Sequence, residues 1–256
     1  MRRFGIVACT FIWASSSIAQ SPANSGALAT TLVRQAISAM TSGTATSDVV
    51  INANITSANG DDADTGTATF RAKGFVESRV DLNLSSGTRT ETRAAAGSGA
   101  WKVNDGNATT AAGQNCQTDA AWFFPALSSL AQVSNPNFVF TYIDDEEHGG
   151  VNTHHIRVYQ TSTAVDSALF ERMTTEEIYL DVQSGLPVAV AFKIHPDSDL
   201  LTDLDTEVRF GNYQKVSGVL VPYSIQRVVN GGVVLDAAVT SAVVNGGVPD
   251  SEFDLE

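Results

Sequence analysis

The sequence predicts a mainly β protein: a single antiparallel meander of about ten strands, with one helix at the N-terminus and a helical plug in the middle. Apolar and polar residues alternate with period two through most of residues 176–255, as they do in strands with one buried face. Because a twisted sheet of about ten strands tends to curl, we expect it to be strongly curved. The alternating runs are separated by turn dipeptides: Ser184-Gly185, Ser217-Gly218, Asn230-Gly231 and Asn245-Gly246.

The first 19 residues have the pattern of a targeting segment. Arg2 and Arg3 precede an apolar run at residues 4–14, and small residues stand before Gln20. The run is too short for a transmembrane helix, which needs about 20 residues. We therefore expect a signal peptide cleaved after Ala19, a periplasmic or secreted product, and a single domain over residues 20–256. The alternative is a lipoprotein leader acylated at Cys9.

Sequence patterns in the first half of the mature chain predict one helix followed by strands. Residues 26–40 place Leu28, Leu32, Ile37 and Met40 at helical spacing, and Ser42-Gly43 is a typical helix end. Alternating residues then predict five strands, the last two of them weaker, at 49–55, 67–76, 80–84, 88–93 and 100–103.

Residues 118–132, called the plug below, contain the densest aromatic cluster of the chain, Trp122, Phe123 and Phe124. Thr118 or Asp119 can cap a helix start, and Pro125 interrupts the helix, so we expect two short helical turns. Two interpretations stay open. The plug is either a core segment, as most aromatic clusters are, or a movable element in the mouth of the curved sheet.

The second half returns to strands. They are expected at residues 138–142 and 151–160, and residues 162–172 form a short helix or a loop. In the 176–255 meander three sets of residues share a face: Ile178, Leu180 and Val182; Val188, Val190, Phe192 and Ile194; and Val233, Leu235, Ala237 and Val239.

The composition excludes several classes of partner. A net charge of −13 argues against nucleic acid and against anionic lipid surfaces, which attract clustered basic residues. No segment after the leader is apolar enough to span a bilayer.

Cys116 is the only cysteine left after cleavage, and without a nearby basic residue we expect an inert, partly buried thiol. No nucleotide-binding, hydrolase or zinc-protease motif occurs, so we expect no cofactor, no metal and a monomer.

Three motifs in the C-terminal half resemble the LolA/LolB-like lipoprotein-carrier superfamily. They are DVQSGLP at 181–187, FGNYQKVSGVLVP at 210–222 and VNGGVPDSEFD at 244–254. The resemblance is architectural over about residues 26–256 and reaches motif level only over 176–254. It implies a half-barrel sheet wrapped over helices, with an apolar cavity for acyl chains and no enzymatic activity.

If the helices fill the concave face incompletely, an apolar cleft remains there. Candidate ligand-contacting residues are Ile51, Phe70, Leu82, Phe140, Val190 and Phe192 on the sheet, with Trp122 and Phe123 on the plug. Ordinary core packing is the alternative role for each of them.

A catalytic role for the histidines is the main competing hypothesis. It would use His154 or His155 with the acidic hairpin Asp144–Glu147, in a hydrolase or a metal-dependent enzyme. Neighbouring residues of a strand point to opposite faces, so only one of the two histidines can face any site. We expect strand-surface histidines without partners, and the acids to form a solvated hairpin tip. A third hypothesis is an envelope interaction protein without a small ligand.

Overall fold

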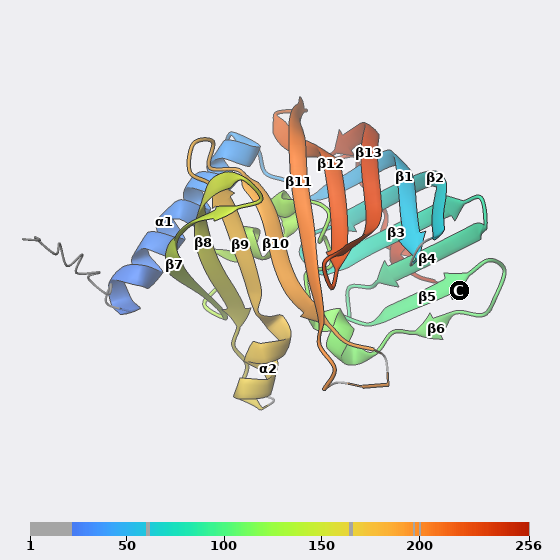
Figure 1. Ribbon diagram of the computed structural model, residues 1–256, viewed down its shortest axis with the longest axis horizontal. Helices are drawn as coiled ribbons and strands as arrows, with labels where there is room; N and C mark the ends of the chain where they lie inside the picture. The colour runs from blue at the N-terminus through green and yellow to red at the C-terminus, as the bar shows by residue number, and fades with distance from the viewer. Residues whose placement is uncertain (1–21, 60–61, 164–165, 197, 200, 256) are drawn as a thin grey trace, which may run out of the picture.

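The computed structural model describes residues 22–59, 62–163, 166–196, 198–199 and 201–255, and all its strands belong to one curled antiparallel sheet (Figure 1). The predicted signal peptide, its cleavage site and Cys9 lie outside these ranges. Strand order is β6-β5-β4-β3-β2-β1-β13-β12-β11-β10-β9-β8-β7, so the chain forms two meanders that join where β1 pairs with β13.

The sheet has thirteen strands in the described ranges, more than the ten or so expected. The first meander comprises β1 (Asp48–Asn59), β2 (Asp62–Lys73), β3 (Glu77–Leu84), β4 (Gly87–Arg93), β5 (Gly99–Val103) and β6 (Thr109–Thr110). The second comprises β7 (Phe138–His148), β8 (Val151–Gln160), β9 (Glu176–Asp181), β10 (Pro187–Ile194), β11 (Leu204–Val216), β12 (Val219–Val229) and β13 (Gly232–Val244). A two-residue strand such as β6 is too short to give a periodic signal.

The turn chemistry is mostly as predicted. Asn230 and Gly231 both have positive φ, 48° and 80°, as a type I′ hairpin requires. Asn245 also has positive φ, but the chain leaves the sheet there, so this turn ends the last strand and does not separate two strands. The Asn245 side chain accepts from the Ser47 backbone N–H and donates to the Ala45 carbonyl, both at 2.8 Å. These two hydrogen bonds connect the end of β13 to the start of β1.

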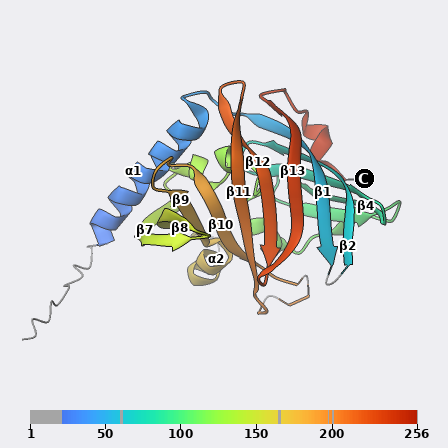
Figure 2. The same cartoon turned by 45° about the horizontal axis from the view of Figure 1, so that its top comes forward.

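Helix α1 (Pro22–Thr41) is longer than expected, and of the residues predicted at helical spacing only Met40 is fully buried. The fully buried side chains are Ala29, Val33, Ala36 and Met40, whereas Leu32 and Ile37 are only partly buried. The two alanines allow a close approach of the helix backbone to the sheet. Helix α1 packs on β7 and reaches β12 (Figure 2).

Several strand ends differ from the predicted alternation. Val76 and Val182 are exposed because β2 ends at Lys73 and β9 at Asp181. Val233 is exposed because a bulge between Arg227 and Val228 shifts the β12–β13 register.

The acids Asp144–Glu147 are not a hairpin tip: they belong to β7, and the turn follows at Gly149-Gly150.

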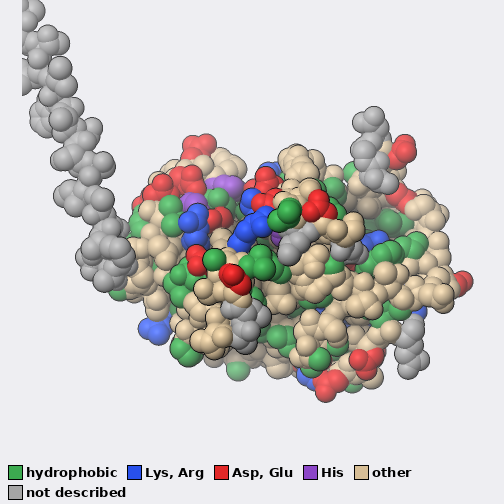
Figure 3. Space-filling view, turned by 90° about the horizontal axis from the view of Figure 1, so that it is seen from below, with side chains coloured by type: hydrophobic (Ala, Val, Ile, Leu, Met, Phe, Trp, Pro, Cys, Tyr) green, Lys and Arg blue, Asp and Glu red, His purple; other side chains and the backbone are tan. Residues whose placement is uncertain are grey.

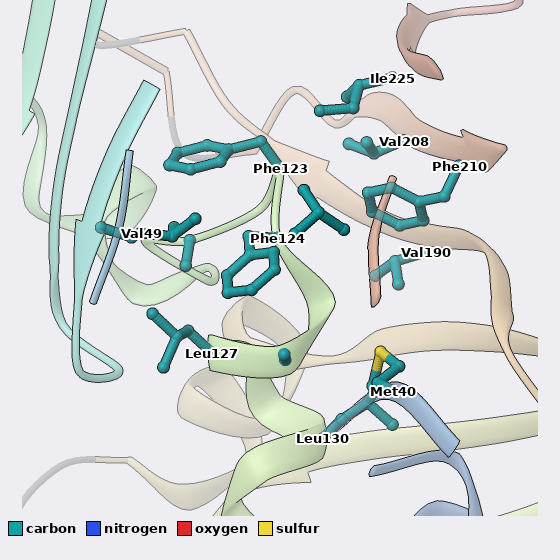
Figure 4. Packing of buried hydrophobic residues seen from close by; sticks show 14 of the residues in the cluster. Met40, Val49, Phe123, Phe124, Leu127, Leu130, Val190, Val208, Phe210 and Ile225 are labelled. Atoms are coloured by element: carbon teal, nitrogen blue, oxygen red, sulfur yellow. The ribbon is translucent and has the colours of Figure 1, made fainter. Parts of the chain in front are cut away.

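The plug lies on the concave face of the sheet, within the segment that links the two edge strands β6 and β7 (Figure 1). Its two short turns, η2 (Pro125–Leu127) and η3 (Ser129–Gln132), confirm the expected pair of helical turns, but Pro125 begins the first turn and the break between the turns lies at Ser128. A further turn, η1 (Gly113–Gln117), precedes the plug. Phe123 and Phe124 point between β1 and the strands that carry Val190, Val208 and Ile225 (Figure 4).

Two other short helices lie outside the plug. Helix α2 (Ser167–Thr174) confirms that residues 162–172 include a helix, and η4 (Asp250–Phe253) follows the last strand. No helix in the described ranges combines the length and apolar character that a bilayer span requires.

Candidate functional site

The inner face of the sheet, meaning the face that the plug covers, is apolar over its centre. Phe70 from β2 contacts Phe123 at a ring-centroid distance of 5.1 Å and Trp122 at 5.9 Å. Phe70 and Phe123 have no solvent-exposed surface, while Trp122 is only partly buried. The plug therefore fills the centre of the concavity and leaves Trp122 at the boundary of the filled region.

Strand β4 changes the character of this face. Its register places Arg89 opposite Leu82 and Glu91 opposite Val80, and directly opposite residues share a face. Val80 belongs to the buried core, so Arg89, Glu91 and Arg93, at alternate positions of β4, also face inward. The inner face is thus apolar at its centre and charged at the β4–β5 end.

A cavity of about 390 Å³ lies at this charged end. It is enclosed by β3–β5, the segment 111–122, and the facing ends of β10, β12 and β13. Its apolar lining includes Val80, Trp101, Trp122, Phe192, Ile194 and Val234. Its charged lining consists of Arg89, Glu91, Arg93 and Arg227.

The segment over the cavity is held from both sides. The Arg93 guanidinium donates to the carbonyls of Thr118 and Asn115, at 2.5 and 2.6 Å. The Asn115 side chain donates to the His195 carbonyl at 2.7 Å and accepts from the His195 N–H at 2.9 Å. These contacts connect β4 to the end of β10, across the opening of the curved sheet.

Close packing of this segment depends on Gly99. A Cβ atom at Gly99 would lie 2.8 Å from the Cys116 Sγ and 3.2 Å from the Ala111 Cβ. Cys116 is partly buried and lines the cavity.

Two arginines lie over the two tryptophans of the cavity. The Arg89 guanidinium carbon lies 5.1 Å from the Trp101 ring centroid, and that of Arg227 lies 5.1 Å from the Trp122 centroid. Arg89 also donates from Nε to Glu91 at 2.7 Å. Burial lowers the pKa of the Arg227 guanidinium, and Arg89 lowers it further, whereas Glu91 opposes the shift.

The plug is tied to β9 by two buried carboxyls, Asp119 and Glu176. Asp119 accepts from the Ser129 N–H at 2.8 Å, so it does not cap a helix start as expected. Glu176 accepts from the Ser129 hydroxyl at 2.6 Å and from the Asp119 N–H at 3.3 Å. Burial raises the pKa of Asp119 to about 6, and burial together with the charge of Asp119 raises that of Glu176 well above its ordinary value. Burial therefore favours the protonated forms of both carboxyls at this junction.

A second group of ionisable residues lies at the β7–β8 end of the sheet. Histidine side chains lie among acidic ones at one end of the face in Figure 3. His155 Nε2 lies 2.8 Å from Glu177, and its Nδ1 lies 3.0 Å from Glu146 and 3.6 Å from Asp144. The expectation of strand-surface histidines without partners is therefore wrong for His155, and it is wrong for His154 too, which contacts Asp145.

Burial opposes the charged form of His155, but the hydrogen bond to Glu177 and the surrounding carboxylates raise its pKa. An imidazolium ion between these carboxylates accounts for the arrangement. Potential metal-ligand atoms of Asp144, Glu146 and His155 also lie within 4.8 Å of one another. His154 is separate from this group, because it faces the other side of the strand and contacts Asp145 at 2.5 Å.

The structure separates the eight predicted ligand-contacting residues into two groups. Trp122 and Phe192 line the cavity. Both also pack in or against the core cluster, as do the other six, which do not line the cavity: Ile51, Phe70, Leu82, Phe123, Phe140 and Val190.

Sequence reasoning missed the charged side of the cavity. The run Arg89-Thr90-Glu91-Thr92-Arg93 alternates charged residues with threonines, which places all three charges on one face of a strand. That pattern was the available signal. The sequence around Arg227 contains no comparable signal, because assigning this residue to the inner face requires the register of β12.

No protein-family model and no curated protein sequence matches the chain. Several solved structures share its fold, three of them over about 90% of this chain. A domain named for outer membrane lipoprotein sorting, from Vibrio parahaemolyticus, is 10% identical with a TM-score of 0.56, over 90% of this chain and 97% of that one. A LolA superfamily protein from Nitrosomonas europaea is 13% identical with a TM-score of 0.55, over 89% and 97% of the two chains. A DUF1329 family protein from Desulfovibrio piger is 9% identical with a TM-score of 0.55, over 90% and 97%.

The chain therefore has a LolA-like fold: a half-barrel antiparallel sheet with an N-terminal helix, as the sequence motifs implied. Identities of this size establish the fold alone.

Proposed function

We propose that this chain is an exported, non-enzymatic carrier that binds a lipid, a lipoprotein acyl chain or another apolar ligand on the concave face of its sheet. It would act as a monomer and as a single domain over residues 20–256, after removal of the leader. The cavity of about 390 Å³ beside the plug is the observation that carries the proposal. Small-molecule sites commonly enclose about 300–1,000 Å³, and each buried CH₂ group contributes about 0.8 kcal/mol.

Trp122 and Phe192 are the predicted residues best placed to contact the ligand, together with Trp101, Ile194 and Val234. For the six predicted residues in or against the core, ligand contact requires displacement of the plug and stays a prediction. The LolA-like fold supports the proposal, because one similar structure is itself named for lipoprotein sorting.

A hydrolase built on His154 and His155 is a weaker candidate. The two side chains leave opposite faces of β8, so they cannot act together on one substrate. The carboxylates around His155 occupy both of its ring nitrogens, which leaves no free nitrogen to act as a base.

The test uses two valines of β13. Val234 lines the cavity, while Val243 is exposed. Binding of 1-dodecanol to the purified protein is measured by calorimetry and by tryptophan fluorescence, since Trp101 and Trp122 both line the cavity. We expect Val234→Phe to fill space and weaken binding at least tenfold, and Val243→Phe to leave it unchanged. Failure of the unmodified protein to bind would overturn the proposal and favour an envelope interaction protein without a small ligand.

A further inference from the structure

Arg227 lines the cavity without a polar partner. Among the described residues, no hydrogen bond or ion pair reaches its guanidinium group, and its Nε is buried and unsatisfied. Its guanidinium carbon lies 5.1 Å from the centroid of the Trp122 ring. Arg227 is partly buried, and a guanidinium group that loses hydration without a hydrogen-bonded anion is unfavourable, because the lost hydration is not replaced.

The other charged side chains at the cavity already have hydrogen-bond partners. Arg93 donates to the Thr118 and Asn115 carbonyls, which hold the overlying segment in place. Glu91, the one acidic residue in the lining, accepts from Arg89 at 2.7 Å. Three arginines and one glutamate leave two positive charges in excess, in a chain whose net charge is −13.

A structural role explains Arg93 but not Arg227. Arg93 bridges strand β4 and the 113–118 segment, so its removal would leave buried carbonyls without donors. Arg227 bridges nothing, and it stands between Ile225 and Val229 on the inner face of β12, where an apolar residue would pack. Its position is that of a binding group.

The remaining walls define the rest of the ligand. Trp101, Trp122, Phe192 and Ile194 face the same space as the arginines. A small hydrated anion would leave these apolar walls unused, and a purely apolar ligand would leave Arg227 unpaired.

We propose that the cavity binds an amphiphile with an anionic head group, a carboxylate or phosphate on an apolar chain, and that Arg227, assisted by Arg89, binds the head group. This inference rests on the proposed function, since it specifies the ligand class of the same cavity. Guanidinium groups suit such head groups because their planar N–H donors match carboxylate and phosphate oxygens.

The experiment compares ligands of equal chain length. Dodecanoate, monododecyl phosphate, 1-dodecanol and inorganic phosphate are titrated into the purified protein by calorimetry. We expect the two anionic amphiphiles to bind at least tenfold more tightly than the alcohol, with inorganic phosphate far weaker than either. Increasing salt should weaken the anionic ligands only, because it screens the arginines.

Three variants test the assignment. Arg227→Met should weaken the binding of dodecanoate at least tenfold and change the affinity for dodecanol less than twofold. Glu91→Gln should have the opposite effect. It should increase the affinity for dodecanoate several-fold, because it removes the competing carboxylate. Arg209→Met is the matched control on strand β11, where the arginine is exposed and paired with Glu207; it should change neither ligand.

The outcomes separate this inference from the proposed function. Equal binding of acid and alcohol, unchanged by Arg227→Met, would overturn the anionic head group and leave the apolar carrier intact. Binding of no amphiphile would overturn both. Inorganic phosphate binding as tightly as monododecyl phosphate would show a free-anion site and also overturn the inference. Thermal melts accompany each variant, and Glu91→Gln keeps the test decisive if Arg227→Met does not fold.

Discussion

Trp122 and Phe123 are neighbours in the chain but belong to two differently built regions of the same inner face. Phe123 is fully buried among Phe70 and the apolar side chains at the centre of the sheet. Trp122 stands at the wall of a cavity, under the guanidinium group of Arg227. One region is a closed apolar core, and the other combines apolar walls with an unpaired cation.

The difference arises from strand composition. Strands β1 and β2 supply apolar residues to the inner face, whereas β4 supplies Arg89, Glu91 and Arg93. Charged side chains retain hydration and cannot be packed at core density without partners, which accounts for the cavity that remains beside them. The core region should therefore determine stability and the cavity region ligand binding.

The sharpest test of this division is Phe123→Ala. Because Phe123 is fully buried, its truncation should lower the free energy of unfolding by about 3–5 kcal/mol, measured in urea. The matched change Val243→Ala, at an exposed residue, should cost less than about 0.5 kcal/mol. A loss below about 1 kcal/mol for Phe123→Ala, with altered ligand binding, would identify the plug as a movable element instead.

The junction between plug and sheet should respond to pH. The folded state holds protons on Asp119 and Glu176 at pH values where the unfolded chain has released them, because unfolded carboxyls titrate near pH 4. Their contribution to stability is therefore complete below about pH 4 and is lost as pH rises through the raised folded pKa values, about 6 for Asp119. We expect a loss on the order of 2–3 kcal/mol between pH 4.5 and 7.5.

Urea unfolding at several pH values measures this slope. Glu176→Gln imitates the protonated carboxyl, so it should flatten the profile and cost little at pH 7. Glu147→Gln, at an exposed position of β7, should leave the slope unchanged. A profile that is as steep in Glu176→Gln as in the unmodified protein would contradict the assignment.

The two cavity arginines offer a matched pair. Arg93→Met removes donors from the Thr118 and Asn115 carbonyls and should lower the free energy of unfolding by about 1.5–3 kcal/mol. Arg227→Met removes an unpartnered charge and should leave stability unchanged or higher. Thermal melts of the two variants side by side are the measurement. Equal destabilisation by both would mean that Arg227 also supports the fold.

The fold was predictable because its signals are local. Period-two alternation, the Asn230-Gly231 turn and the short helical turns that begin at Pro125 are all decided within a few residues of sequence. The pairing of β1 with β13, some 190 residues apart, carries no such signal and was not predicted.

The site was harder to predict because its contacts join residues that are distant in the sequence. The partnership of Asp119 with Glu176 and the stacking of Arg227 on Trp122 join distant segments through the curvature of the sheet. The charged alternation of β4 was visible, but its meaning depends on which face is concave.

The smallest expected effect concerns His155, at the end of the sheet away from the cavity. It lies between Glu177 on one ring nitrogen and Glu146 on the other, and its pKa is raised in the folded state. Its contribution to stability should be fully present below about pH 6.5, the ordinary pKa of histidine, and lost as pH rises through the higher folded value. Because the surrounding carboxylates are partly exposed, we expect His155→Gln to cost no more than about 1 kcal/mol at pH 5.5 and almost nothing at pH 8.5. His154→Gln, on the opposite face, is the control, and melts at the two pH values with and without EDTA are the measurement. A melting temperature that falls on EDTA addition in the unmodified protein but not in His155→Gln would replace the imidazolium ion with a metal at Asp144, Glu146 and His155, and would revive a metal-dependent activity at this end of the molecule.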